Sequence, residues 1–362
     1  MKLVCFDYCE EFRCLAGGCP DTCCRDWEIV IDPETLAFYR SVPGELGERL
    51  RAAVHTENGE SWFALQDGHC PLLTENGLCG VQLGLGEQAL CTTCREHPRF
   101  IEEYGQTQEL TLSASCPAAA RLLLREQPVR LVSRETGEPA DNFCTLDPAL
   151  YFALYHARAA AISLVQDRSL PLADRLALLL WCSVRLQRQL DESRYDRIAL
   201  LTKRLSDPAF RQHQLARLRR GRMRQGSFFP CWMLLNNMEH LTKRFPALLD
   251  KAVFSAAPCA SFDGPFSCQT ENLAVYFLFR YFLKAANDGQ LLPRVESCLF
   301  HLLCIRSLYT TGRMNSAEEL QLLVSLYSKE VEHSEENLQL LRRVFSSGTL
   351  SWRYLLCLID PS

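Results

Sequence analysis

The sequence predicts a mainly α-helical protein in two parts: an irregular cysteine-rich metal-binding module with short strands, followed by an irregular helical bundle. Eleven of the 19 cysteines lie in the first 116 residues, a region broken by glycine and proline. From about residue 145 onward, apolar residues recur at the i, i+3, i+4 and i+7 spacing of amphipathic helices. No fixed-period repeat is visible, which argues against a solenoid. We therefore predict a cysteine-rich module over residues 1–125 and a helical domain over 145–362.

Short apolar runs define the expected elements of the N-terminal module. Residues 27–32 (WEIVID) alternate like a short strand, and Pro33 stands at the first turn of a predicted helix that follows it. A second strand is predicted at 108–115 (QELTLSAS), and a helix begins at 116–126 (CPAAARLLLRE). Proline and glycine in 127–143 predict a connection to the helical domain.

The C-terminal domain contains a series of segments that share helical periodicity and are separated by short polar stretches. Their packing is expected to form an irregular bundle. The predicted helical segments are 146–168, 170–192, 195–205, 210–221, 231–245, 270–287, 291–312, 317–334 and 336–347.

Composition and charge exclude several classes of protein. The chain is 48% hydrophobic and 23% charged, as folded domains usually are, and its net charge of −4 argues against a nucleic-acid partner. The N-terminus has no apolar signal-peptide core, and no apolar run reaches the roughly 18 residues that span a bilayer. We expect a soluble cytoplasmic chain without a membrane partner. In that reducing compartment, dense cysteines indicate metal binding or redox chemistry rather than disulfides.

The N-terminal cysteines occur in bursts. CLAGGCPDTCCRDW (14–27) holds four of them, CPLLTENGLCG holds two, CTTC holds two, and one more stands in SASCP. The spacings match neither a zinc ribbon nor the ferredoxin run, and they lack the C-x3-C-x2-C triad of radical S-adenosylmethionine enzymes. An all-thiolate site is favoured, which is compatible with both zinc and an iron–sulfur cluster.

The remaining eight cysteines stand singly among apolar residues and are predicted to be inert core residues. They are Cys144, Cys182, Cys231, Cys259, Cys268, Cys298, Cys304 and Cys357.

The motifs FRCLAGGCPDTCCRDWEIVID, CPLLTENGLCGVQLGLGEQAL, TCREHPRFIEEYG and ELTLSASCPAAARLLL resemble the flagellin lysine-N-methylases of enteric bacteria. That family belongs to a wider group with zinc- or iron-chelating cysteine clusters. A weaker resemblance continues through most of the chain. The resemblance implies a set of metal-site cysteines, of which a subset of about four is expected to ligate. It favours an iron–sulfur cluster, [4Fe–4S], over zinc. Cys91 looks like an addition to the family set. The implied positions are Cys14, Cys19, Cys23, Cys24, Cys70, Cys79, Cys94 and Cys116.

The resemblance also implies methyl transfer from S-adenosylmethionine to surface lysines of flagellin, the expected partner. That chemistry requires a deprotonated lysine held in line with the sulfonium methyl, and an aromatic or negative wall for the cation. No methyltransferase motif is recognisable, since GLGEQ (84–88) lacks the context of a dinucleotide-binding loop.

Candidate residues for this chemistry are therefore polar side chains within apolar helices, although each also fits a buried hydrogen bond or a helix cap. The catalytic candidates are Tyr276, Glu332 and His333, and the cofactor-binding candidates are Arg158, Gln166, Arg168 and Asn272. Asp26, Trp27 and Arg99 are candidates for supporting the metal site.

The basic stretch 211–226 has six arginines and no acidic residue. It predicts either a solvated helix face or a docking surface for an acidic partner such as flagellin. The alternative to the enzyme is a non-catalytic iron–sulfur or zinc-binding protein with a redox or interaction role.

Overall fold

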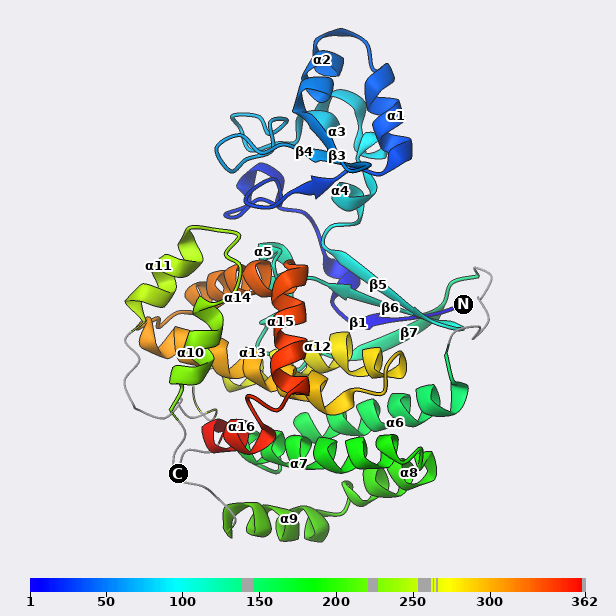
Figure 1. Cartoon of the computed structure of the whole chain (residues 1–362), viewed down its shortest axis with the longest axis vertical. Coiled ribbons are helices and arrows are strands. Elements are labelled where there is room, and N and C mark those ends of the chain that lie inside the picture. Colours follow the sequence, from blue (N-terminus) through cyan, green and yellow to red (C-terminus); the bar gives the residue numbers. More distant parts are fainter. Residues whose placement is uncertain (138–145, 221–226, 253–261, 263, 265, 360–362) are drawn as a thin grey trace.

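The computed structural model describes residues 1–137, 146–220, 227–252, 262, 264 and 266–359. A small lobe, which contains most of the N-terminal cysteines, stands above a larger helical body (Figure 1). The mainly helical fold with few short strands confirms the predicted fold class.

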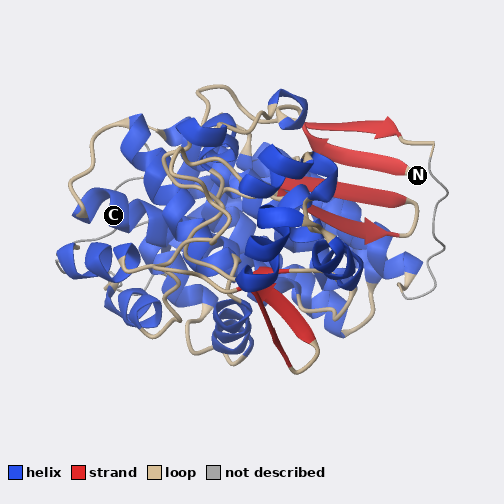
Figure 2. Cartoon of the chain, turned by 90° about the horizontal axis from the view of Figure 1, so that it is seen from above, coloured by secondary structure: helices blue, strands red, loops and turns tan. Residues whose placement is uncertain are grey.

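A four-stranded sheet runs along one side of the body, in the order β5-β6-β1-β7 (Figure 2). Strand β1 (Lys2–Phe6) pairs in parallel with β6 (Thr107–Leu112) and antiparallel with β7 (Leu131–Glu135). Strand β5 (Arg99–Tyr104) pairs antiparallel with β6. The prediction of a strand at 108–115 is confirmed by β6, whereas β7 lies in a stretch that was expected to be only a connection.

The small lobe is built around a three-stranded sheet of order β2-β4-β3 and four short helices. The carboxylate of Asp32 accepts hydrogen bonds from the backbone N–H groups of Thr35 and Thr92, each at 2.9 Å, so one side chain holds the first turns of two helices. The predicted helix at Pro33 is confirmed. The elements are β2 (Ile29–Val30), α1 (Pro33–Ser41), α2 (Gly44–Ala53), β3 (Val54–Glu57), β4 (Glu60–Phe63), α3 (Gly80–Leu85) and α4 (Thr92–Glu96).

The body contains the predicted helical series, and most of the segments form one helix each. The segment predicted at 231–245 is divided between α10 and α11, and a 3₁₀ turn (Phe282–Ala286) follows α12. The helices are α5 (Pro117–Leu123), α6 (Pro148–Val165), α7 (Leu172–Asp191), α8 (Tyr195–Arg204), α9 (Pro208–Arg220), α10 (Phe229–Asn236), α11 (Arg244–Lys251), α12 (Ser267–Tyr281), α13 (Leu291–Thr311), α14 (Ala317–Glu332), α15 (Glu335–Ser346) and α16 (Trp352–Ile359).

Two separate hydrophobic cores divide the chain. The core of the small lobe includes Ile29, Leu50, Phe63 and Leu72. Strand β1, the inner side of β6 and helix α5 belong instead to the core of the body. The division between the cores therefore differs from the predicted boundary near residue 125, because strand pairing returns the N-terminus and residues after 98 to the body.

The prediction that the single cysteines of the helical body are core residues is confirmed for four of the six that the structure describes. Cys182, Cys231, Cys298 and Cys304 are buried, and Cys268 and Cys357 are half-buried. Cys144 and Cys259 lie outside the described residues. Within the part of the chain that the structure describes, no helix is long and apolar enough to cross a membrane.

Candidate active site

A cavity of about 260 Å³ lies where the small lobe meets helix α14. Four rings surround it. Trp27 comes from the loop after the cysteine burst, and His97 from the segment before β5. Phe100 lies at the start of β5, and His333 lies at the end of α14. The ring centroids are 4.6 Å apart for Trp27–His333, 5.5 Å for Trp27–His97 and 5.4 Å for Phe100–His333. Cys23 and Cys94 also line the cavity, so it lies against the thiols.

Both imidazoles are neutral near pH 7. Burial, with the positive charge of Lys329, lowers the pKa of His97 to about 4. Burial and the charge of Arg280 lower the pKa of His333 to about 3. The Nε2 atom of His333 lies 3.0 Å from the hydroxyl of Ser113 and 2.9 Å from that of Ser115, which hold its ring in place. A neutral imidazole can accept a proton or face a cation without repulsion.

A buried lysine ties the cysteine loop to α14. Lys329 is 1% exposed, and its ammonium group lies 4.7 Å from the centre of the Trp27 ring. It pairs with Asp21 at 3.3 Å and Asp26 at 3.7 Å and donates to the backbone carbonyl of Arg25 at 3.2 Å. Trp27 is fixed further by its indole N–H, which donates to the Cys23 carbonyl at 2.9 Å. Asp26 and Trp27, which were predicted to support the metal site, therefore both contact Lys329 beside the cysteine loop.

Of the three catalytic candidates, only His333 lines the cavity. The Glu332 carboxylate accepts hydrogen bonds from Tyr281 at 2.6 Å and Tyr276 at 3.2 Å, accepts another from Ser328, and pairs with Arg280 at 2.9 Å. The guanidinium of Arg280 in turn lies 3.6 Å from the centre of the Phe100 ring. Glu332 and Tyr276 therefore reach the cavity wall only indirectly, because Glu332 contacts Arg280, which lies over the Phe100 ring.

The four cofactor-binding candidates do not converge on this cavity. Arg158 forms a buried ion pair with Glu109 of β6, and Arg168 pairs with Glu271 at 3.0 Å. The Asn272 side chain hydrogen-bonds the backbone of residues 123–129, and Gln166 donates to the Val129 carbonyl at 2.8 Å. The contacts of Asn272 and Gln166 hold the segment between α5 and β7 against the helices.

The thiols gather in two groups, and the cysteines in both are free of disulfides. The first thiol group is Cys14, Cys19, Cys23 and Cys116: burial raises the pKa of Cys116, and the neighbouring thiols of Cys19 and Cys14 raise this pKa further. The second thiol group belongs to the small lobe, where Cys70 and Cys91 are buried in the core and Cys24, Cys79 and Cys94 pack against it. Adjacent in sequence, Cys23 and Cys24 join the two groups.

Two of these sulfurs are set up to carry negative charge. A hydrogen bond from the Cys23 thiol lowers the pKa of Cys24 to about 7, and one from Cys94 lowers the pKa of Cys91. Burial instead raises the pKa of Cys79 and Cys116, each of which directly precedes a short helix.

Among the residues described, no three histidine, cysteine, aspartate or glutamate side chains converge closely enough to hold a single metal ion.

Sequence reasoning did not assign roles to Lys329, His97, Ser113 and Ser115. The alternation of serines in SAS before Cys116 and the histidine in CREHP were the available signals. Neither signal predicts the cavity without the fold, because His333 is more than 200 positions away from these serines.

Comparison with known proteins identifies the family. The model for the FliB lysine N-methylase C-terminal domain matches residues 158–358. Similar curated proteins include the lysine-N-methylases of Salmonella choleraesuis and Salmonella typhimurium, each 30% identical over 137 residues, which is 36% of this chain and 34% of theirs. The flagellar biosynthetic protein FliU of Salmonella muenchen is 29% identical over 126 residues, 33% of this chain and 75% of its own.

The match thus spans about a third of the length of the two lysine-N-methylases. No solved structure matches the chain. Since the family model covers more than half of the 362 residues, the chain belongs to the FliB lysine N-methylase family.

Proposed function

We propose that the protein is a protein-lysine N-methyltransferase that moves methyl groups from S-adenosylmethionine to surface lysines of flagellin. Family membership and the names of the Salmonella relatives, lysine-N-methylase and flagellar biosynthetic protein FliU, support this function. The observation that carries it in the structure is the cavity walled by Trp27, His97, Phe100 and His333.

The cavity suits a reaction between two cations. Aromatic faces attract a lysine ammonium or a sulfonium, and the two imidazoles add no charge of their own near pH 7. The fixed charges around it are balanced, because Lys329 pairs with Asp21 and Arg280 pairs with Glu332. A bound cation would therefore meet rings and ion pairs rather than an unpaired charge.

The residues would act on the incoming lysine. Burial among these rings lowers the pKa of a lysine amine, which favours the neutral, nucleophilic form. S-adenosylmethionine, when bound, would supply an electrophilic methyl group on a sulfonium, whose sulfur would keep the electron pair of the broken bond. His97, whose ring has no hydrogen-bond partner among the described residues, would relay the amine proton to water, because its low pKa keeps it from holding the proton.

We propose further that an iron–sulfur cluster occupies thiols of the two groups, with a structural and positioning role. The support is the gathering of free thiols in two groups, one of which includes buried cysteines of the small lobe. Each group contains enough cysteines for one cube.

Intact-mass spectrometry of flagellin, incubated with anaerobically purified protein and S-adenosylmethionine, tests the activity. We expect mass increases in steps of one methyl group that map to lysine. His97→Asn should lower kcat by about 100-fold, as loss of a general base does. The control is His156→Gln, which changes an exposed imidazole on α6 and should leave the rate unchanged. No mass shift with the metal site loaded would contradict the proposal and favour the non-catalytic alternative.

Iron and sulfide analysis tests the cofactor. Cys116→Ser changes the first thiol group and Cys70→Ser the second, while Cys182→Ala changes a buried thiol with no cysteine neighbour. We expect loss of iron in at least one of the first two variants and none in the third. Zinc in place of iron, or full iron in all three variants, would contradict the cluster.

A further inference from the structure

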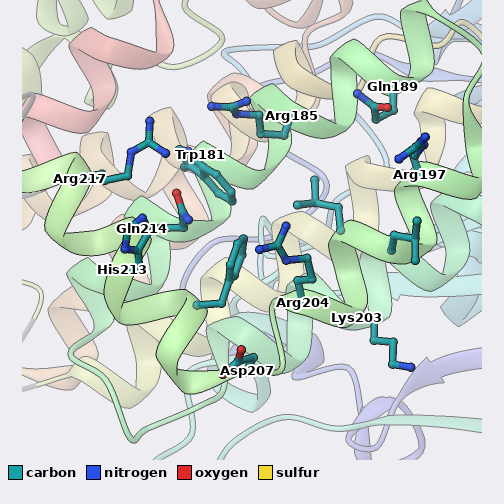
Figure 3. A pocket seen from close by; sticks show the side chains of 13 residues that line it. Trp181, Arg185, Gln189, Arg197, Lys203, Arg204, Asp207, His213, Gln214 and Arg217 are labelled. Carbon is teal, nitrogen blue, oxygen red and sulfur yellow. The ribbon is translucent and has the colours of Figure 1, made fainter.

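A second, larger cavity lies between α7, α8 and α9, at the opposite end of the molecule from the small lobe (Figures 1 and 3). Its volume is about 1000 Å³, at the upper end of the range for ligand sites. None of its lining residues belongs to the candidate active site, so whatever it binds is not at the reaction centre.

The lining is strongly basic. One acidic residue, Asp207, faces five cations and a histidine, and its carboxylate already accepts the N–H of Ala209 at 2.9 Å at the start of α9. The basic residues are Arg185, Arg197, Lys203, Arg204, His213 and Arg217.

Of these cations, Arg197 pairs with the exposed Asp196 at 3.8 Å, whereas three others have no carboxylate partner in the part of the chain that the structure describes. Arg211 pairs with Asp167 and Arg219 pairs with Asp174 at 2.8 Å, whereas no carboxylate of the described residues pairs with Arg185, Arg204 or Arg217. The arginines of the basic stretch 211–226 thus have different surroundings: two of them pair with the body, and Arg217 faces the cavity. Residues 221–226 lie outside the described residues.

Two aromatic rings fix the orientation of two guanidinium groups. The Arg185 guanidinium lies 5.4 Å from the centre of the Trp181 ring, and that of Arg204 lies 4.3 Å from the centre of the Phe210 ring. Stacking of this kind holds the guanidinium plane while leaving its N–H edge free for a carboxylate. The two rings meet edge to face at 5.8 Å and therefore bring both arginines to one place.

An amide adds hydrogen-bonding groups to the cavity wall. Gln214 lines the cavity beside Trp181 (Figure 3) and has no hydrogen-bond partner among the residues described, so its amide is free to bind a ligand. A peptide backbone, which offers both N–H and C=O groups, can supply a partner.

We propose that this cavity binds an acidic peptide segment of a protein partner. Spaced carboxylates match the separate guanidinium and ammonium groups, and the peptide backbone matches the amide of Gln214. A single nucleic-acid strand fits less well, since bases need free aromatic faces and these rings already carry arginines. The site is independent of the proposed methyl transfer.

Fluorescence anisotropy with a dye-labelled peptide of alternating glutamate and serine tests the proposal on the full chain. We expect saturable binding, weakened at least tenfold in the double variant Arg185→Glu/Arg204→Glu. The matched control, Arg188→Glu/Arg220→Glu, makes the same change of charge at exposed positions on α7 and α9 that do not line the cavity. It should alter affinity by less than about threefold. Thermal melts of both variants check that they fold.

Two further measurements separate the proposed site from a general positive field. Arg185→Lys/Arg204→Lys keeps the charge but removes the guanidinium groups that lie over the Trp181 and Phe210 rings. We expect it to weaken binding as well. An oligonucleotide with as many negative charges as the peptide should bind more weakly. Absence of saturable peptide binding, an equal effect of the control variant, or tighter binding of the oligonucleotide would overturn the proposal.

Discussion

The small lobe and the helical body maintain their folds in different ways. The body has an extensive apolar core, and its central helix α13 is buried along almost its whole length. The small lobe has a short list of buried residues, and two of them, Cys70 and Cys91, are thiols. Small cores are marginal without a metal or cross-link. The body therefore has an extensive core of its own, whereas the lobe, with few buried side chains, is also held by contacts with α14.

The largest effect should come from the buried ion pair that joins the sheet to α6. Arg158→Met leaves the Glu109 carboxylate buried and unpaired, which we expect to cost about 3–5 kcal/mol of unfolding free energy in urea titrations. Replacing both residues with Arg158→Met/Glu109→Leu should recover most of the loss. Arg134→Met, which breaks the exposed pair with Glu10, should cost at most about 1 kcal/mol. An equal loss in all three variants would contradict this account.

Paired core truncations compare the two regions directly. Leu299→Ala in α13 and Leu50→Ala in α2 each remove a buried side chain, and each should cost about 2–5 kcal/mol. Hydrogen exchange should locate the effects: Leu50→Ala accelerates exchange within the lobe alone, whereas Leu299→Ala destabilises the body. If Leu50→Ala accelerates exchange throughout the body, the two cores unfold as one unit.

The body also contains a buried carboxyl group that lowers the free energy of unfolding at neutral pH. Burial raises the pKa of Glu296 to about 8, so the folded state keeps its proton where the unfolded state has lost it. A raised carboxyl pKa makes stability fall as the pH rises from about 4.5 towards about 8. Glu296→Gln should therefore raise stability by on the order of 2 kcal/mol near pH 7 and by little near pH 4.

Urea titrations at several pH values measure this effect. The control is Glu318→Gln, an exposed glutamate at the start of α14, which should show no such pH dependence. A gain from Glu296→Gln that is the same at every pH would mean that packing, not ionisation, causes it.

The smallest effect concerns helix caps in the two regions. Asp32 caps α1 and holds the start of α4, whereas Asp147 caps only α6. We expect Asp32→Ala to cost about 1–2 kcal/mol and Asp147→Ala about 1 kcal/mol or less. Hydrogen bonds from Thr92 and Thr35 to the carboxylate hold the pKa of Asp32 well below its usual range. Its contribution is therefore present above about pH 4 and is lost as the pH falls through the folded-state pKa. Equal losses in the two variants would show that the second helix start does not matter.

The sequence predicted the local elements well. The helical period from residue 146 onward, the Pro33 helix and the strand in β6 are confirmed, because each depends on residues a few positions apart. Strands β1 and β7 were missed. Their partners lie about 100 and 130 residues away, and short strands have little pattern of their own.

The candidate site was predicted only in part. Trp27 and His333 were named separately, one as a support for the metal site and one as a catalytic candidate, and the fold brings their rings to 4.6 Å. Tyr276 and Glu332 are also near, but they reach the cavity wall only indirectly, through Arg280 and Phe100. Arg158 and Asn272 were chosen because they are polar in apolar helices, and that pattern is equally produced by buried structural contacts.

The sequence by itself determined the helical class, the concentration of thiols near the N-terminus and the basic character of the stretch that begins at Arg211. These properties are local, since they follow from periodicity, composition and spacing. The tertiary structure alone decided that β1 pairs with β6, that the thiols gather in two groups, that His333 faces Trp27, and which arginines of α9 are paired. Each of these depends on contacts between residues far apart in the chain, whose free energy no local pattern encodes.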